Sequence, residues 1–284
     1  MKVYELYSSI DGNYVIAGAA EKDTEIWDMR TYKKVMDLKT KYELGGKRLA
    51  IADNGQFCAA AAYNRFGITL YDAKGGEIIW NIKEIKHIQR ISFTGNDENL
   101  FVSNNEGQTF ILDLAVGKII SKTNGAKNII YNKYGSDIIM NDYYIKYNNY
   151  RIEPKKEKLI LGVCCLPNGF ACSTVGEGLY VYNTEGLLMW KADNNKNEHF
   201  VSISYLKKYN YVCGIVYKYD SPRTTPYYVV YCYNAGTGDL KYAHDLDEGF
   251  SYAFIKESEQ IISGSGRVFQ LNEAGADVIK QIKF

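Results

Sequence analysis

Apolar and polar residues alternate over short stretches along almost the whole chain. In Gly67–Tyr71, for example, Thr69 separates Ile68 from Leu70, which is the period of two expected for a β-strand with one buried face. Clusters of Asn, Asp and Gly follow such stretches, and these residues tolerate the positive φ angles of tight hairpin turns. The 26 tyrosines agree with this pattern, because tyrosine favours half-buried pleated surfaces. The sequence therefore predicts an all-β chain of short strands.

One strand ending recurs seven times, as an aromatic residue or leucine followed by Asp or Asn. The seven pairs are Trp27-Asp28, Tyr71-Asp72, Leu112-Asp113, Tyr147-Asn148, Tyr182-Asn183, Tyr233-Asn234 and Leu271-Asn272. Successive pairs lie 35 to 51 residues apart, near the length of a four-stranded propeller blade. A second turn precedes each pair in phase with it, as in Asp11-Gly12 and Asn54-Gly55.

These two turns define a repeating unit of four strands, which we letter A to D in chain order. Such a unit has two apolar faces, so it needs a neighbour on each side, and closing the ring removes the exposed ends. We therefore predict a single domain over residues 1–284, a closed seven-bladed β-propeller of four-stranded antiparallel blades. The alternative is a sandwich or two smaller β domains, which the in-phase turns disfavour.

The order of the repeats also predicts how the ring closes. Every blade uses contiguous sequence, so we expect the last blade to pack face to face against the first. The unit containing Tyr147-Asn148 is the weakest match, because no glycine follows in its turn.

Trp27-Asp28 after Thr24–Ile26, and the turn-containing stretch 8–18, resemble the strand-C ending and the A–B turn of WD-repeat propellers. The likeness covers essentially the whole chain. The sequence departs from that family in lacking its Gly-His dipeptide and in holding one literal Trp-Asp. The family's Asp-His-Ser-Trp hydrogen-bond network is therefore not carried over.

Two strand-D segments, which end at Trp80 and Trp190, are similar to the repeat of quinoprotein propellers. In that group the tryptophan docks against the next blade, and the resemblance implies the same packing for Trp80 and Trp190. Quinone dehydrogenases usually have eight blades and a metal site, so the seven repeats argue against that activity. The two resemblances together imply a divergent propeller, for which we expect no cofactor.

Charge and cysteine content limit the functions that the chain can have. Lys and Arg total 34 against 33 Asp and Glu, so the net charge of +1 favours neither nucleic acid nor an anionic membrane. No stretch approaches the roughly 20 apolar residues of a membrane span, and the N-terminus lacks the apolar run of a signal peptide.

The six cysteines have no CxxC spacing, which predicts buried thiols in a reducing cytoplasm. An exported propeller whose leader has been removed is the alternative, and paired cysteines would favour it. The bias toward Lys, Asn, Ile and Tyr is common in AT-rich bacterial genomes.

The three histidines, His87, His199 and His244, fall in expected connections from strand D to the next strand A. These connections share one rim of the ring, which we call the top face. His199 with Glu198, and His244 with Asp245 one blade on, form the best candidate for a metal or acid–base site. No HxH or HxxxH spacing, nucleophile elbow or phosphate-binding loop supports such a site. We therefore predict no catalytic or metal residues and no enzyme.

Two expected top-face loops have the composition of recognition surfaces. The longest interval contains Tyr219 and Arg223 with two of the four prolines, and Arg65 with Phe66 forms the tip of another loop. Arginine and aromatic residues are enriched where proteins bind one another. An extended hairpin that shields a blade edge explains the insertion equally well, and Phe66 folded onto its own blade is the alternative for the second loop.

The sequence thus leads to the hypothesis of a non-catalytic, monomeric scaffold that binds a protein or peptide through its top-face loops. The residues assigned to partner binding are Arg65, Phe66, His87, His199, Tyr219, Arg223 and His244. The alternative is a small-ligand-binding protein, or a hydrolase or lyase, that uses the central channel or the top rim. A flat, tyrosine-rich top face would favour the scaffold, whereas a deep pocket with clustered histidines and carboxylates would favour the alternative.

Overall fold

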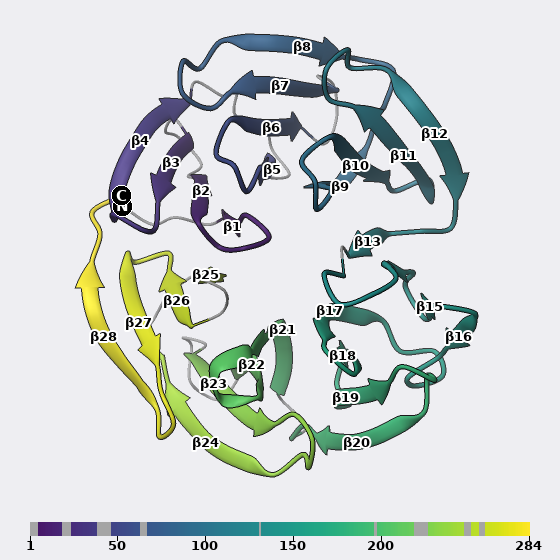
Figure 1. The fold of residues 1–284 in the computed structure, drawn as a ribbon, viewed down its shortest axis with the longest axis vertical. Coiled ribbons are helices and arrows are strands. Elements are labelled where there is room, and N and C mark those ends of the chain that lie inside the picture. Colours follow the sequence, from purple (N-terminus) through teal and green to yellow (C-terminus); the bar gives the residue numbers. More distant parts are fainter. Residues whose placement is uncertain are drawn as a thin grey trace.

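The computed structural model describes residues 5–18, 24–38, 47–62, 67–130, 132–195, 198–218, 227–246, 251–255 and 259–284. Over these ranges the chain forms seven four-stranded antiparallel sheets. The sheets stand as blades around a central axis (Figure 1). The chain is a seven-bladed β-propeller, which confirms the fold predicted from the repeats.

Each blade is built from consecutive strands, with the first strand nearest the axis and the fourth on the perimeter (Figure 1). Blades 1 to 4 contain β1 (Glu5–Ser8), β2 (Tyr14–Gly18), β3 (Thr24–Asp28), β4 (Lys33–Leu38); β5 (Lys47–Ile51), β6 (Phe57–Ala62), β7 (Ile68–Asp72), β8 (Ile78–Ile82); β9 (Ile88–Phe93), β10 (Asn99–Asn104), β11 (Gln108–Asp113), β12 (Ile119–Asn124); and β13 (Asn128–Ile130), β14 (Ile138–Met140), β15 (Ile145–Tyr147), β16 (Tyr150–Ile152). Blades 5 to 7 contain β17 (Ile160–Leu166), β18 (Gly169–Thr174), β19 (Gly178–Asn183), β20 (Leu188–Asp193); β21 (Glu198–Leu206), β22 (Tyr211–Lys218), β23 (Tyr227–Asn234), β24 (Leu240–Asp245); and β25 (Tyr252–Ile255), β26 (Gln260–Ser263), β27 (Arg267–Leu271), β28 (Ala276–Gln281). A short 3₁₀ turn, η1 (Lys207–Tyr209), joins β21 to β22.

The fourth blade, whose sequence repeat is the weakest, has strands of three residues each. In its C–D turn Asn148 takes the place of a glycine and adopts φ 52°, a left-handed conformation that Asn tolerates better than most residues. The Asn148 side-chain amide donates a 3.2 Å hydrogen bond to the carbonyl oxygen of Thr184 in the next blade. The turn without glycine is therefore still a blade turn, and it is tied to its neighbour.

Trp80 and Trp190 each dock against the following blade, as the resemblance to quinoprotein repeats implies. The indole Nε1 of Trp80 donates to the carbonyl oxygen of Leu114 at 2.8 Å, and that of Trp190 donates to Ala235 at 2.9 Å. Each ring lies directly over a glycine of the neighbouring C–D turn, Gly117 or Gly238, where a Cβ atom would come within 2.8 Å of the indole. Both contacts therefore combine apolar packing with a satisfied N–H group.

The ring closes by packing between the last blade and the first, as predicted. One apolar cluster contains Leu6 and Val15 of blade 1 together with Ile262 and Val268 of blade 7. The ring of Phe284 meets that of Trp27 edge-on, with centroids 5.7 Å apart. Figure 1 shows β28 beside β4 at this junction, with no strand exchanged between the two sheets.

The cysteines are part of the packed core. None of the six forms a disulfide bond; Cys165 is half-buried and the other five are buried. Burial raises the pKa of the Cys58 thiol to about 12, because the charged thiolate is poorly solvated in an apolar interior. The cysteines thus act as small apolar residues, in agreement with the sequence prediction. In the described ranges no helix is long and apolar enough to cross a membrane.

Candidate functional site

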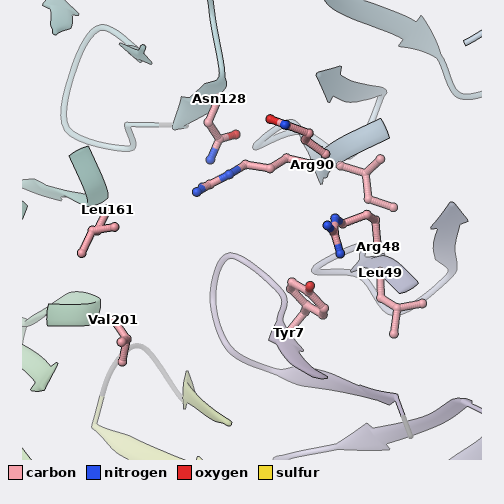
Figure 2. Close-up of a pocket in the computed structure, with 9 residues that line it drawn as sticks. Tyr7, Arg48, Leu49, Arg90, Asn128, Leu161 and Val201 are labelled. Carbon is pink, nitrogen blue, oxygen red and sulfur yellow. The ribbon is translucent and has the colours of Figure 1, made fainter. Parts of the chain in front are cut away.

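The innermost strands of the blades surround a central channel with a cavity of about 570 Å³ (Figure 2). Its volume falls within the range of pockets that hold small ligands. Nine residues from six blades line it: Tyr7, Arg48, Leu49, Gln89, Arg90, Ile91, Asn128, Leu161 and Val201. The channel cavity is thus built jointly by the inner strands of six blades.

The cavity has one polar wall and one apolar wall. Figure 2 shows Tyr7, Arg48, Arg90 and Asn128 gathered on one side, on the inner strands of blades 1 to 4. Their polar groups face the opening between the strands.

Leu161 and Val201 stand across the opening, on blades 5 and 6 (Figure 2). Val201 is 47% exposed although it belongs to an inner strand, because its side chain faces the channel and not a neighbouring blade. A ligand in this cavity would meet charged and polar groups on one side and aliphatic side chains on the other.

The two arginines differ in their partners. Arg48 lies 4.0 Å from the carboxylate of Glu5, a long ion pair. Among the residues that the structure describes, no carboxylate forms an ion pair with Arg90 and no group accepts a hydrogen bond from it. Desolvation inside the ring lowers the pKa of Arg90, and the charge of Arg48 acts in the same direction, while Tyr7 and Asp142 oppose the shift.

Tyr7 and Asn128 add neutral polar groups beside the arginines. Burial raises the pKa of the Tyr7 hydroxyl, with a smaller contribution from Glu5. The Tyr7 side chain therefore keeps its proton and is available as a hydrogen-bond donor. Asn128 Oδ1 is buried and has no hydrogen-bond partner among the described residues. The polar wall therefore holds donors and an acceptor that the described residues do not fully satisfy.

The structure places the three histidines on the top face but does not bring them together. His87 adopts φ 54° in the connection between β8 and β9, as expected. His199 and His244 are not in connections, because β21 and β24 extend through them, with Tyr217 and Val230 as their register partners.

The expectation that His199 and His244 occupy neighbouring blades is also wrong. β21 and β24 are the innermost and outermost strands of the same sheet, and β22 and β23 lie between them. Glu198 and Asp245 are separated in the same way. In the described parts of the chain, no group of three or more His, Cys, Asp or Glu residues could hold a metal ion.

The remaining sequence-predicted residues, Arg65, Phe66, Tyr219 and Arg223, lie outside the described residues. The strands that lead into the long insertion are described, however, and they carry a tyrosine cluster on the top face of blade 6. Tyr217 and Tyr228 are register partners on β22 and β23, with ring centroids 5.5 Å apart. Tyr228 also packs on Tyr252 of blade 7, at 4.6 Å. We call Tyr217, Tyr228 and Tyr252 the top tyrosine cluster.

A charged pair lies beside this cluster, on the opposite face of the blade 6 sheet. Lys218 Nζ lies 2.8 Å from Glu198 Oε1, and the same ammonium group sits over the ring of Tyr231 at 5.0 Å. Glu198 and Lys218 are register partners on β21 and β22, so the pair joins the innermost strand to the extended hairpin. Burial disfavours the charged form of Glu198, but hydrogen bonds from Lys218 and Asn195 outweigh it, so the pKa of this carboxyl is lowered.

The lowered pKa of Glu198 predicts how stability depends on pH. A carboxyl with a lowered folded-state pKa adds stability above its unfolded pKa of about 4.5, and that contribution is lost as the pH falls through the folded value. We expect Glu198→Gln to unfold about 1–2 kcal/mol more easily at pH 7, because a charge-assisted hydrogen bond is weakened. Between about pH 5 and 3 the wild type should lose stability more steeply than the variant. Urea unfolding across this pH series measures both effects.

A matched control for this prediction is Glu185→Gln, which changes an exposed carboxylate in the C–D turn of blade 5. Its pH profile should follow that of the wild type. Identical profiles for Glu198→Gln and the wild type would contradict the assigned role of the pair.

Comparison with known proteins assigns neither a family nor a function to the chain. No protein-family model matches the chain, and no curated protein sequence matches it at a significant level. The assignment of a site therefore rests on the geometry of the channel and of the top tyrosine cluster.

Proposed function

We propose that this propeller is a non-catalytic interaction platform that binds a protein or peptide partner through its top face. The observation that carries the proposal is the top tyrosine cluster on the extended hairpin of blade 6. Tyrosine gives a large, rigid and amphipathic contact surface at a low cost in conformational entropy, which suits it to protein recognition. The resemblance to WD-repeat propellers supports the same use of the ring by analogy of fold.

The cluster is built to stay in place. Tyr217 and Tyr228 are held by cross-strand pairing, Tyr228 is held a second time by Tyr252 of the next blade, and the ion pair between Lys218 and Glu198 ties β22 to β21. A surface that is ordered before binding loses less entropy when the partner arrives. The separation of His199 from His244 also favours binding over acid–base chemistry on this face. In this proposal the protein acts as a monomer, and its buried unpaired thiols suit a reducing cytoplasm.

The test compares two double variants in affinity purification from a lysate of the native organism. Tyr217→Ser with Tyr228→Ser removes most of the cluster. Tyr134→Ser with Tyr205→Ser removes a comparable ring pair, 6.5 Å apart, beside the A–B turns on the opposite rim. Thermal unfolding establishes that both variants remain folded.

We expect a specific protein to be captured by the wild type and by the control, and to be lost from the top-face variant. Cross-linking of the purified complex should then place that partner next to β22 or β23. A partner that both variants retain, or that only the control loses, would contradict the top-face site. The absence of any specific partner would contradict the platform itself.

A further inference from the structure

Three β-bulges on the inner strands shape the channel cavity. In each bulge one residue of the inner strand has no register partner on the second strand of its blade. These residues are Gln89 in β9, Leu161 in β17 and Val201 in β21. All three extra residues line the cavity. A bulge costs regular strand pairing and turns a side chain in a new direction, and bulges are over-represented next to functional sites. The three bulges thus direct one side chain each from blades 3, 5 and 6 into the same cavity.

The charges in this cavity are also only partly compensated. Arg48 and Arg90 extend into the same space. Desolvation lowers the pKa of Arg90 and repulsion from Arg48 adds to it, while Tyr7 and Asp142 oppose the shift. Glu5 is the one carboxylate among the described residues that forms an ion pair with either of them, at 4.0 Å from Arg48. Like charges held together in a partly desolvated space are unfavourable unless an anion joins them. Guanidinium groups bind carboxylates and phosphates especially well, through two parallel hydrogen bonds.

We propose that the channel binds a small organic anion. Its carboxylate or phosphate group contacts Arg90 and Arg48, Tyr7 and Asn128 contribute further hydrogen bonds, and its apolar part lies against Leu161 and Val201. The two walls of the cavity are complementary to such a molecule, and about 570 Å³ is enough space for it. This site goes beyond the proposed platform, because it lies inside the ring and uses none of the residues of the top tyrosine cluster.

Isothermal titration with four six-carbon probes tests the proposal. Sodium hexanoate and hexyl phosphate carry the two candidate head groups, while hexanol and hexylammonium present the same chain with no charge and with positive charge. We expect saturable binding of at least one of the two anions and none of hexanol or hexylammonium. Equal responses to all four probes would show that the apolar tail alone is bound and would overturn the proposal, as would no binding of either anion.

The variants Arg90→Gln and Arg151→Gln locate the site. Arg90→Gln should weaken anion binding at least about tenfold, because a charge-assisted contact is lost. Arg151 lies on β16 at the perimeter, where its side chain is exposed and pairs with Glu153, so Arg151→Gln makes the same change in net charge away from the channel. Equal affinities for the two variants would overturn the proposal.

Thermal unfolding without ligand separates a binding role of Arg90 from a structural one. If Arg90 serves to bind the ligand, it has no ion pair or hydrogen bond to lose among the described residues, so Arg90→Gln should keep or raise the melting temperature while anion binding is weakened. If Arg90 had a structural role, Arg90→Gln would instead lower the melting temperature. A clear loss of stability with unchanged anion binding would overturn the proposal. Arg48→Gln repeats the binding test on a second strand in case Arg90→Gln does not fold.

The anion could be a free metabolite or an acidic side chain of a bound protein. A short peptide of glutamate residues, added in competition with hexanoate, distinguishes these sources. Hexanoate binding that the peptide leaves unchanged assigns the channel to a free small anion. Displacement by the peptide, lost in Arg90→Gln, assigns the same site to an acidic segment of a partner. The top-face double variant should bind hexanoate like the wild type, so failure of either proposal can be recognised independently of the other.

Discussion

Replacing Gly178 with alanine should lower the free energy of unfolding by at least about 4 kcal/mol, a loss of the size seen when backbone atoms are forced apart. Gly178 begins β19 with φ +131°, and a Cβ at this position would lie 2.0 Å from the backbone carbonyl oxygen of Ala192. That oxygen belongs to β20, which pairs with β19, so it can move only if the sheet is disturbed. Urea unfolding of the purified variant measures the loss.

Gly176→Ala is the matched control, two residues away in the same turn. Gly176 also has a positive φ, +70°, but nothing lies within 4 Å of its added Cβ. We expect Gly176→Ala to lower the free energy of unfolding by about 1 kcal/mol, because an alanine is strained in the left-handed conformation even without a steric clash. If the two variants were equally stable, the backbone contact between β19 and β20 would not be as close as described.

Trp80→Ala should be the next most damaging change, with a loss of roughly 3 kcal/mol, at the lower end of the range for buried tryptophan because Trp80 is half-buried. The variant loses the packing between blades 2 and 3, and the carbonyl oxygen of Leu114 loses the donor that lies 2.8 Å away. Trp80→Phe keeps a ring over Gly117 but removes the N–H group. It should therefore cost only about 1 kcal/mol. Urea unfolding ranks the two variants.

A double-mutant cycle with Gly117→Ala tests whether the contact between the Trp80 ring and Gly117 accounts for the loss of stability in Trp80→Ala. In the wild type the new methyl group would meet the indole at 2.8 Å, whereas in Trp80→Ala the space is empty. Gly117→Ala should therefore cost less in the Trp80→Ala background than in the wild type. Additive losses would contradict a direct contact between the ring and the turn.

The two proposed sites use different parts of the same ring. The top tyrosine cluster extends from the hairpin of blade 6, where β22 and β23 are eight residues long. The channel site is formed by β1, β5, β9 and β13 on one side and by β17 and β21 on the other. β21 belongs to both, because Glu198 supports the hairpin and Val201 lines the channel. A partner on the top face and an anion in the channel would therefore contact the same inner strand.

The histidines show where sequence reasoning failed. The repeats predict a strand-D ending before His244 and a strand-A beginning after His199, yet both residues lie within strands. Whether a strand continues depends on the hydrogen-bond partners that its neighbour offers. Tyr217 pairs with His199, and Val230 pairs with His244, because the hairpin of blade 6 is longer than those of other blades. That length comes from pairing between strands, which local alternation does not show.

The channel residues escaped prediction for a related reason. Arg48 and Arg90 belong to different repeats, and each looks like an ordinary polar position of an alternating strand. Their convergence depends on the ring bringing β5 beside β9. The bulges at Gln89, Leu161 and Val201 reverse the expected direction of a side chain, and a period of two cannot reveal them.

Alternation, turns and repeats along the chain suffice to predict the repeating blade, the number of blades and the buried cysteines, while the docking of Trp80 and Trp190 was implied by the resemblance to quinoprotein repeats. These features depend on alternation and turn chemistry within about ten residues, or on a repeat that each blade carries in full. Only the folded ring shows that Arg48 and Arg90 share a cavity, that Leu161 and Val201 face them, and that His199 and His244 stand apart. Such arrangements arise from contacts between blades and from the pairing length of each strand, and these are settled only when the ring closes.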